Sequence, residues 1–350
     1  MGRDKVSAVQ TFIDLLAGRR EASALAPREW DGVIGVARSE AMLPTLAHRL
    51  DGAGLPPTVA ALFADQRAAA AVAQRQALWE AEMARRALAP VGIEFVLLKG
   101  AAYAAAGMAC AAGRQIGDLD ILVLAADIRR AENALLNAGW EWVKSDPYDD
   151  FYYREHMHEL PPLIHKSRDR MIDVHHTILP RTHRITPDAL AMIATSIEIP
   201  AGFHVLNPPN MLCHCAAHLL ADGDLQGGIR NLWDFHCLVL DFLKRDTEFH
   251  LIAMEVADSH GLGAVVARGF RLANRLFGTP LKPDGWRGDL GFAAEPLDAF
   301  FVRRLLARDN WGRVTQPLTE HAFYIRSHWL RMPPTMLAKH LWTKWRKSQV

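Results

Sequence analysis

Two aspartates separated by one residue carry the strongest chemical signal in the sequence. Asp118 and Asp120 lie in the segment 117–123, GDLDILV, which continues as an apolar run typical of a strand. Side chains alternate along a strand, so both carboxylates would point to the same side of the sheet. Adjacent negative charges repel unless a cation lies between them, and Mg²⁺ typically takes one or two carboxylates together with substrate phosphates. The spacing favours a metal site, with a solvated strand entry as the alternative.

A third aspartate stands inside another apolar segment. Asp173 lies in residues 171–176, MIDVHH, which also contain His175. A carboxylate within an apolar strand is costly to bury unless it is paired or bound to metal. If this strand lies beside the one that carries Asp118 and Asp120, three carboxylates converge. Such a triad can hold two metal ions, which would polarise a nucleophile and neutralise a leaving pyrophosphate, and Asp173 could also accept the acceptor's proton.

Lys99 and Gly100 end an earlier apolar run, residues 94–100, EFVLLKG. A glycine at this point lets phosphates approach the backbone, and the first turn of a following helix supplies N–H donors. Lys99 adds a positive charge. An ordinary strand-to-helix turn is the alternative interpretation of this motif.

The order of these motifs, LLKG, then GDLDILV, then IDVHH, resembles the uncharacterised nucleotidyltransferase family of the DNA polymerase beta-like superfamily. The flanks are similar too, because a helical region ends in a long helix before the LKG strand and a second helical region follows the core. In the second region, HCAAHLL and IRNLWDFHCLVL resemble the family's His-rich helix and its Arg-x-x-x-Asp helix. The resemblance spans roughly residues 30–280.

The resemblance implies a role for each matching residue. The metal-binding and catalytic residues would be Asp118, Asp120 and Asp173, with two Mg²⁺ ions, or Mn²⁺ in their place. The nucleotide-binding residues would be Lys99, Gly100, Arg114 and Gly117, and further cleft residues would be His175, His214, His218 and Arg230. The superfamily usually has Gly-Gly or Gly-Ser where this chain has Gly100-Ala101. The triphosphate would therefore be held by backbone amides, Lys99 or Arg114, and the segment from Gly100 to Asp118 is longer than is usual in the superfamily.

Two pairs of residues in the second helical region have local interpretations as well. His214 and His218 share a helix face, and with Cys213 and Cys215 nearby a zinc site is conceivable. A structural zinc site needs four ligands, and no second cluster of suitable spacing is obvious, so packing of His218 near the cleft is favoured. Arg230 and Asp234 are also four residues apart and would form a local ion pair, with a role for Arg230 in the phosphate or acceptor site as the alternative.

The remaining sequence predicts the elements that position these residues. Strong helix formers dominate residues 1–90, and Pro90-Val91-Gly92 would end the last helix there. Strands are predicted at 94–98, 120–124, 140–143, 151–165 and 170–176, and helices at 101–110 and 127–138 and again from about 208 onward, the last one starting near 333. In the strand 151–165, His156 and His158 would face one side and Met157 and Glu159 the other, with Glu159 solvated or near the metals. The fold class is therefore α+β, a small mixed sheet flanked by helical regions, divided into an N-terminal helical region (1–90), an α/β core (91–205) and a C-terminal helical domain (206–350).

Composition and charge argue against several classes of protein. Of 350 residues, 40 are basic and 39 acidic, so the chain has no overall field to attract nucleic acid, and 16 histidines are the one unusual count. Four cysteines without a CxxC pair are no disulfide framework. Neither a signal peptide nor a run of 18 apolar residues is present, which predicts a cytoplasmic protein that does not engage a membrane.

Together these observations predict a Mg²⁺-dependent nucleotidyltransferase. It would transfer NMP from an NTP to a hydroxyl or phosphate of a small-molecule, peptide or glycan acceptor and release pyrophosphate. One alternative is a non-catalytic nucleotide-binding or regulatory module with the same fold. Another is a toxin-like RNA-modifying enzyme that uses the basic, Trp-containing residues 326–347, although packing of this segment as an amphipathic helix is favoured over nucleic-acid binding.

Overall fold

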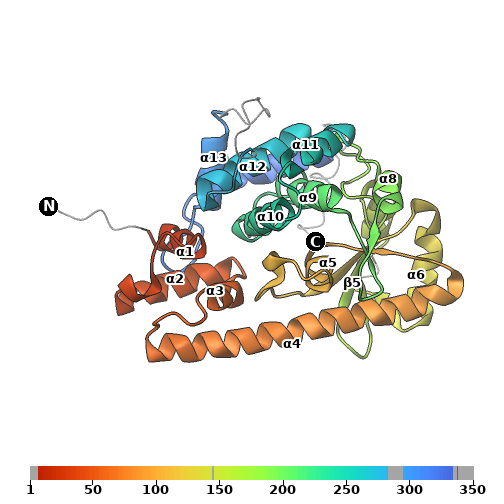
Figure 1. The fold of residues 1–350 in the computed structure, drawn as a ribbon. Helices are drawn as coiled ribbons and strands as arrows, with labels where there is room; N and C mark the ends of the chain where they lie inside the picture. The colour runs from red at the N-terminus through yellow and green to blue at the C-terminus, as the bar shows by residue number, and fades with distance from the viewer. Residues whose placement is uncertain (1–6, 144–145, 283–294, 334–336, 338–350) are drawn as a thin grey trace, which may run out of the picture.

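The computed structural model describes residues 7–143, 146–282, 295–333 and 337. Within these residues the chain is α+β, with one seven-stranded mixed sheet surrounded by helices, which confirms the fold class expected from the sequence (Figure 1). One cluster of buried hydrophobic residues extends from Ala8 to Phe323. The division at residues 90 and 205 stays a prediction.

The sheet has the strand order β3-β4-β5-β2-β1-β7-β6. Its strands are β1 (Val96–Leu97), β2 (Asp118–Leu122), β3 (Trp140–Trp142), β4 (Leu163–His165), β5 (Met171–His175), β6 (Ile197–Glu198) and β7 (His204–Val205). The apolar runs at 94–98, 120–124, 140–143 and 170–176 form β1, β2, β3 and β5, and the hairpin of β6 and β7 was not predicted.

The central strands β2 and β5 are parallel, and Asp120 lies opposite Asp173 in their register. Strand β1 is antiparallel to β2 on the other side, so the end of β1 lies beside the start of β2. Residues directly opposite one another in a sheet point to the same face, and this register therefore brings the aspartates of both strands together.

Helices before and after the sheet cover it. The N-terminal helices are α1 (Ala8–Leu16), α2 (Pro27–Ser39), α3 (Leu43–Arg49) and α4 (Pro57–Leu88). Helix α4 has 32 residues, about 48 Å, and packs on α3 at one end and on α5, α6 and β2 along its length (Figure 1). It ends at Leu88, and a 3-10 turn through Pro90 leads to Gly92, whose φ of +67° stops the helical run as predicted.

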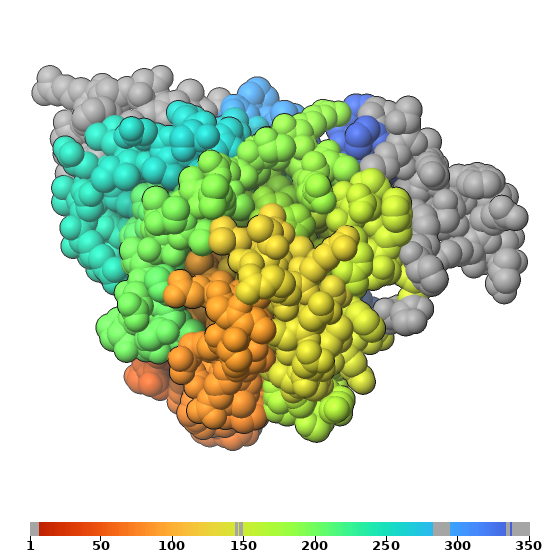
Figure 2. Space-filling view, turned by 90° about the vertical axis from the view of Figure 1, so that its right-hand side faces the viewer, coloured from red at the N-terminus to blue at the C-terminus, as the bar shows by residue number. Residues whose placement is uncertain are grey.

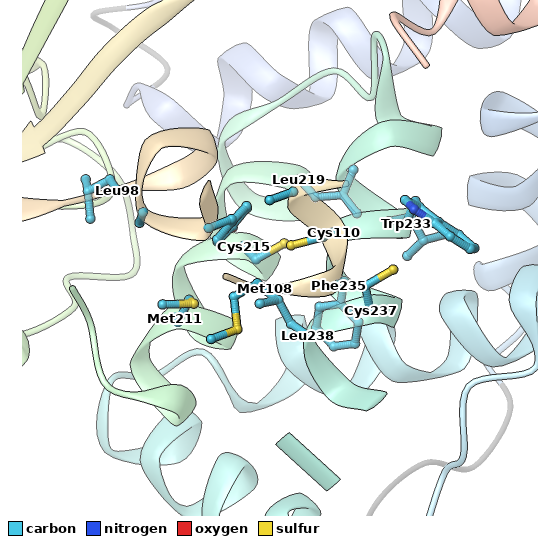
Figure 3. Packing of buried hydrophobic residues seen from close by; sticks show 14 of the residues in the cluster. Leu98, Met108, Cys110, Met211, Cys215, Leu219, Trp233, Phe235, Cys237 and Leu238 are labelled. Carbon is cyan, nitrogen blue, oxygen red and sulfur yellow. The ribbon is translucent and has the colours of Figure 1, made fainter. Parts of the chain in front are cut away.

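The later helices fall into two groups, those inserted between the strands and those that follow the sheet. Those inserted in the sheet are α5 (Lys99–Ala105), α6 (Ile128–Asn137), α7 (Pro147–His156) and α8 (Ala189–Ala194), and those that follow it are α9 (Pro208–Ala216), the π-helix η5 (Ala217–Asp222), α10 (Gly228–Leu243), α11 (Phe249–Ser259), α12 (Gly263–Phe277), α13 (Asp298–Leu305) and α14 (Pro317–Arg331). The space-filling view shows the sheet region, orange to yellow-green, below the helices that follow residue 208, green to cyan (Figure 2). Met108 and Cys110, which follow α5, pack among Cys215 of α9 and Phe235 and Leu238 of α10 (Figure 3).

The segment between α5 and β2 contacts both helical regions. Gly113 has a φ of +67°, and a Cβ at this position would lie 2.3 Å from the carbonyl oxygen of Pro44 in α3. Thr45 Oγ1 also donates to the carbonyl oxygen of Gly113 at 3.3 Å. On the other side, Asp241 of α10 accepts a hydrogen bond from the backbone N–H of Ala109 at 2.6 Å. The backbone at Gly113 therefore touches α3 with no room for a side chain.

The predicted strand at 151–165 is wrong over most of its length. Residues 147–156 form helix α7, Glu159 makes an isolated bridge to His175, and only 163–165 belong to a strand. Arg154 pairs with Asp150 one turn away and with Glu132 of α6, at 2.9 Å and 2.7 Å, and these ion pairs favour the helix over the β propensity of the aromatic residues. His156 therefore ends a helix and shares no strand face with His158.

Only part of the basic, Trp-containing C-terminal segment lies among the described residues. The segment 338–350, with most of the basic and Trp residues, and the start of the helix predicted near 333 lie outside the described residues. Arg326 donates to the carbonyl oxygen of Leu220, and Arg331 pairs with Asp222 at 2.9 Å. No helix among those described has the length and apolarity needed to cross a bilayer.

Asp298 at the start of α13 should stabilise the fold in a pH-dependent way. It pairs with Arg271 at 2.6 Å and Arg268 at 3.0 Å, and although burial opposes this, the two guanidinium groups lower its pKa below 3.8. A lowered pKa gives stability that is present above the unfolded value and lost as the pH falls through the folded value. We expect Asp298→Asn to lower the unfolding free energy by about 1–3 kcal/mol at pH 7 and by much less at pH 3, as measured by urea denaturation. An equal loss at both pH values would contradict this.

Candidate active site

The structure brings the three predicted aspartates together. Asp118 and Asp120 stand on β2 and Asp173 on the neighbouring β5, with one oxygen of each within 4.8 Å of the others. Asp120 is buried, Asp173 is half-buried, and Asp118 is exposed at the start of its strand. The cluster therefore opens to the surface at Asp118.

One lysine compensates part of this charge. Lys99 Nζ lies 2.5 Å from Asp120 Oδ1, and His175 Nε2 lies 3.1 Å from the same oxygen. Burial alone would raise the pKa of Asp120, but Lys99 and His175 hold it well below its usual range. Partial desolvation by the surrounding chain and the neighbouring Asp120 raise the pKa of Asp118, although its side chain reaches the surface. Burial, then Glu159 and Asp120, raise the pKa of Asp173 to about 7. Two carboxylates are thus left without sufficient positive charge, and a hard-oxygen set of this kind fits a divalent cation.

Lys99 is held in position by the backbone. It is the first residue of α5, with a φ of +47°, which is uncommon for a residue with a side chain. The preceding N–H, of Leu98, donates to the carbonyl oxygen of Asp120 at 3.0 Å, which ties the end of β1 to β2. The turn therefore directs the ammonium group toward Asp120.

The two predicted glycines differ in their surroundings. A Cβ at Gly100 would lie 2.9 Å from Nε of Arg114 and 3.2 Å from Cγ1 of Ile116, so this glycine makes room for the Arg114 side chain. A Cβ at Gly117 would meet nothing within 4 Å. The open space next to the carboxylates is therefore at Gly117.

Arg114 is largely buried, with 12% of its side chain exposed, and pairs with the buried Asp234 of α10. Its guanidinium also lies 5.6 Å from the ring centroid of Tyr103. The local ion pair predicted between Arg230 and Asp234 is replaced by this long-range one, because a buried guanidinium needs a counter-ion and a surface-type i,i+4 pair is worth little. Arg230 donates instead to the carbonyl oxygen of Ala41, between α2 and α3.

A small pocket lies next to Lys99, between α5, α9 and α10. Its lining residues are Lys99, Tyr103, Arg114, His214, Cys215, His218, Asn231 and Asp234. Four predicted site residues thus share one pocket, and Arg230 does not line it. Burial lowers the pKa of His214 to about 3 and that of His218 well below 6.5, so both are neutral at pH 7. His218 belongs to the π-helix η5, an element frequent at functional sites.

A second group of potential ligands was not predicted. His158, Glu159 and His175 each place one ligand atom within 4.8 Å of the other two. The side chain of Glu159 is only 17% exposed, and its Oε2 lies 3.5 Å from His175 Nε2, so it is no solvated strand residue. His214 and His218 form no group of three possible ligands with the cysteines nearby in the part of the chain that is described. The sequence signal for the group was the adjacency of His158 and Glu159, which the wrong strand prediction placed on opposite faces.

Comparison with known families gives one result. The model of a family described as uncharacterised nucleotidyltransferase matches residues 26–278. The matched segment contains the three aspartates, Lys99 and the whole pocket lining. No curated protein matches the chain.

Proposed function

The chain belongs to the uncharacterised nucleotidyltransferase family, and on this basis we propose that it transfers NMP from an NTP to a hydroxyl or phosphate of an acceptor, with release of pyrophosphate. The observation that carries the proposal is the convergence of Asp118, Asp120 and Asp173 within 4.8 Å on two neighbouring strands. A family of nucleotidyltransferases implies an NTP as one substrate, and the carboxylates supply the ligands that a metal-bound NTP needs.

The three aspartates would hold Mg²⁺, with two ions as the expected number and Mn²⁺ as a substitute. Divalent ions there would polarise the attacking oxygen and neutralise the charge on the leaving pyrophosphate. Lys99 and His175 fix the buried Asp120 through hydrogen bonds of 2.5 Å and 3.1 Å, so this ligand is already oriented. Asp173 is the residue that would accept the proton of the acceptor hydroxyl.

The nucleotide would approach from the open side of the carboxylates. Gly117 leaves space beside Asp118, and Lys99 and Arg114 border the adjoining pocket, so the phosphates would lie across these residues and Gly100. Neutral His214 and His218 would face the acceptor. A small-molecule, peptide or glycan acceptor remains our expectation, as does a cytoplasmic location.

Thermal unfolding with each of the four NTPs, with and without Mg²⁺, tests the proposal. At 100 times its dissociation constant, a bound NTP is expected to stabilise the protein by about 2.7 kcal/mol. Asp118→Asn should abolish the Mg²⁺-dependent part, because it removes the exposed ligand of the triad. The control is Asp169→Asn, an exposed aspartate whose φ of +53° also suits asparagine.

Mg²⁺-dependent stabilisation that persists in Asp118→Asn would refute the assignment of the aspartates as the metal site. If no NTP stabilises the protein, the assignment of an NTP as its substrate is refuted. The protein is then incubated with the stabilising NTP and a cell extract as the source of acceptor, and pyrophosphate release is measured. This assay distinguishes an enzyme from a non-catalytic nucleotide-binding module. Binding without pyrophosphate release would favour a non-catalytic nucleotide-binding module.

A further inference from the structure

The group of His158, Glu159 and His175 has a rigid backbone. The N–H of His176 donates to the carbonyl oxygen of His158 at 2.9 Å, and the N–H of Leu160 donates to that of Val174 at 2.9 Å. These bonds hold the segment on each side of Glu159 against β5, where Glu159 is bridged to His175. The three side chains are therefore positioned by the sheet, as a precise binding site requires.

The three side chains converge on one point. Glu159 Oε2 lies 3.5 Å from His175 Nε2 and 3.7 Å from His158 Nε2. The centroids of the two imidazole rings are 5.1 Å apart and the ring planes are inclined by 34°, so the rings face each other at a tilt. Two imidazole nitrogens and one carboxylate oxygen thus surround a common space.

The histidines are deficient in hydrogen bonds. His158 is 7% exposed and His175 1%, and the Nδ1 atom of each is buried without a partner among the described residues. His158 Nε2 lies 3.7 Å from Glu159 Oε2, which is too long for a hydrogen bond. A buried imidazole without a partner costs about 1–3 kcal/mol, which a ligand for its nitrogen would offset.

From this geometry we propose a second metal site, in which His158 Nε2, Glu159 Oε2 and His175 Nε2 bind a transition-metal ion of the Zn²⁺ class. Two imidazoles and a carboxylate are a recurrent ligand set for zinc and other first-row ions, whereas Mg²⁺ prefers oxygen ligands alone. The site differs in ligand chemistry from the all-oxygen aspartate cluster and does not depend on the proposed reaction.

Binding requires a proton to move within His175. Its Nε2 lies 3.1 Å from Asp120 Oδ1 and is hydrogen-bonded to it, and the same nitrogen would have to offer its lone pair to the metal. The proton then moves to Nδ1, and the Asp120 bond is replaced by the metal bond. Asp120 keeps its contact with Lys99. The two metal sites are therefore adjacent, joined through His175 and Asp120.

Titration of the metal-free protein with Co²⁺, in an excess of Mg²⁺ that fills the aspartate cluster, tests the site. Visible absorption reports nitrogen ligation of Co²⁺, and calorimetry with Zn²⁺ gives the affinity and stoichiometry. We expect one ion per chain and a loss of affinity of about 100-fold or more in His158→Gln. Glu159→Gln is the second variant, because its side chain is more exposed and its replacement disturbs packing least.

The matched control is His156→Gln, whose side chain lies two residues before the site, outside the group. Co²⁺ binding should be unchanged in His156→Gln and in Asp118→Asn, while Asp118→Asn alone loses Mg²⁺-dependent NTP binding. The NTP site and the second metal site can therefore fail independently, and these variants show which of the two has failed. Co²⁺ affinity that persists in His158→Gln or Glu159→Gln overturns the second site, as does a loss confined to Asp118→Asn or an absence of binding in excess Mg²⁺.

Discussion

Replacing Asp173 by asparagine is expected to make the metal-free protein more stable and to weaken divalent-metal binding by about 100-fold or more. The carboxylate of Asp173 is half-buried and lies within 4.8 Å of oxygens of Asp118 and Asp120, with one lysine to compensate the three charges. Asparagine has the same shape and no charge, so it relieves repulsion in the free protein. The same change removes one of the ligands that Mg²⁺ or Mn²⁺ would use.

Two measurements on the Asp173→Asn variant test this prediction. Urea denaturation in EDTA at pH 8 should give a gain in unfolding free energy of about 1–3 kcal/mol, because the substitution removes a half-buried and poorly compensated charge. Titration with Mn²⁺, followed by its paramagnetic signal, gives the affinity. Asp169→Asn serves again as the neutral control. A variant that is less stable and binds Mn²⁺ like the wild type would contradict the metal assignment.

Asp234→Ala is expected to lower the unfolding free energy by about 3–5 kcal/mol, because it leaves the buried guanidinium of Arg114 without its counter-ion. A loss of this size is a large fraction of the 5–15 kcal/mol typical of a folded protein. Calorimetry or urea denaturation measures it. Asp241→Ala on the same helix removes a hydrogen bond to the backbone N–H of Ala109 and an exposed pair with Lys244, and it should cost far less.

The double variant Arg114→Met/Asp234→Leu separates stability from binding. Replacing both members of a buried pair by apolar residues is often neutral or stabilising, so we expect most of the lost stability to return. Under our proposal for Arg114, the stable double variant should still bind Mg²⁺-NTP more weakly than the wild type. Full NTP affinity in a stable double variant would make Arg114 a purely structural residue.

The strand positions of the three aspartates were predictable because they depend on local patterns. The apolar runs around Asp118, Asp120 and Asp173 indicated strands, and the alternation of side chains indicated the shared face of Asp118 and Asp120. Local patterns did not specify that Asp173 stands opposite Asp120, since strand order and register are set by tertiary contacts. The family resemblance also covered this part, and the matched residues 26–278 confirm it.

The errors arose where long-range contacts outweigh local preference. Phe151, Tyr152 and Tyr153 favour a strand, yet Arg154 is held in a helix by acidic partners at positions 132 and 150. Asp234 has an arginine one turn away but pairs with Arg114, 120 residues distant. His158 and Glu159 come together with His175 only because a backbone bridge joins them. No single-sequence pattern encodes partners of this kind.

The segment from Gly100 to Asp118 contacts both helical regions. In one stretch, the backbone touches α3 at Gly113, the side chain of Arg114 reaches α10, and four residues later the chain supplies Asp118. The loop that leads into β2 thus contacts both helical regions, which are far apart in sequence. Because β2 begins four residues after Arg114, we expect a displacement of either helical region to displace Asp118 as well, so that the two regions and the aspartates move together.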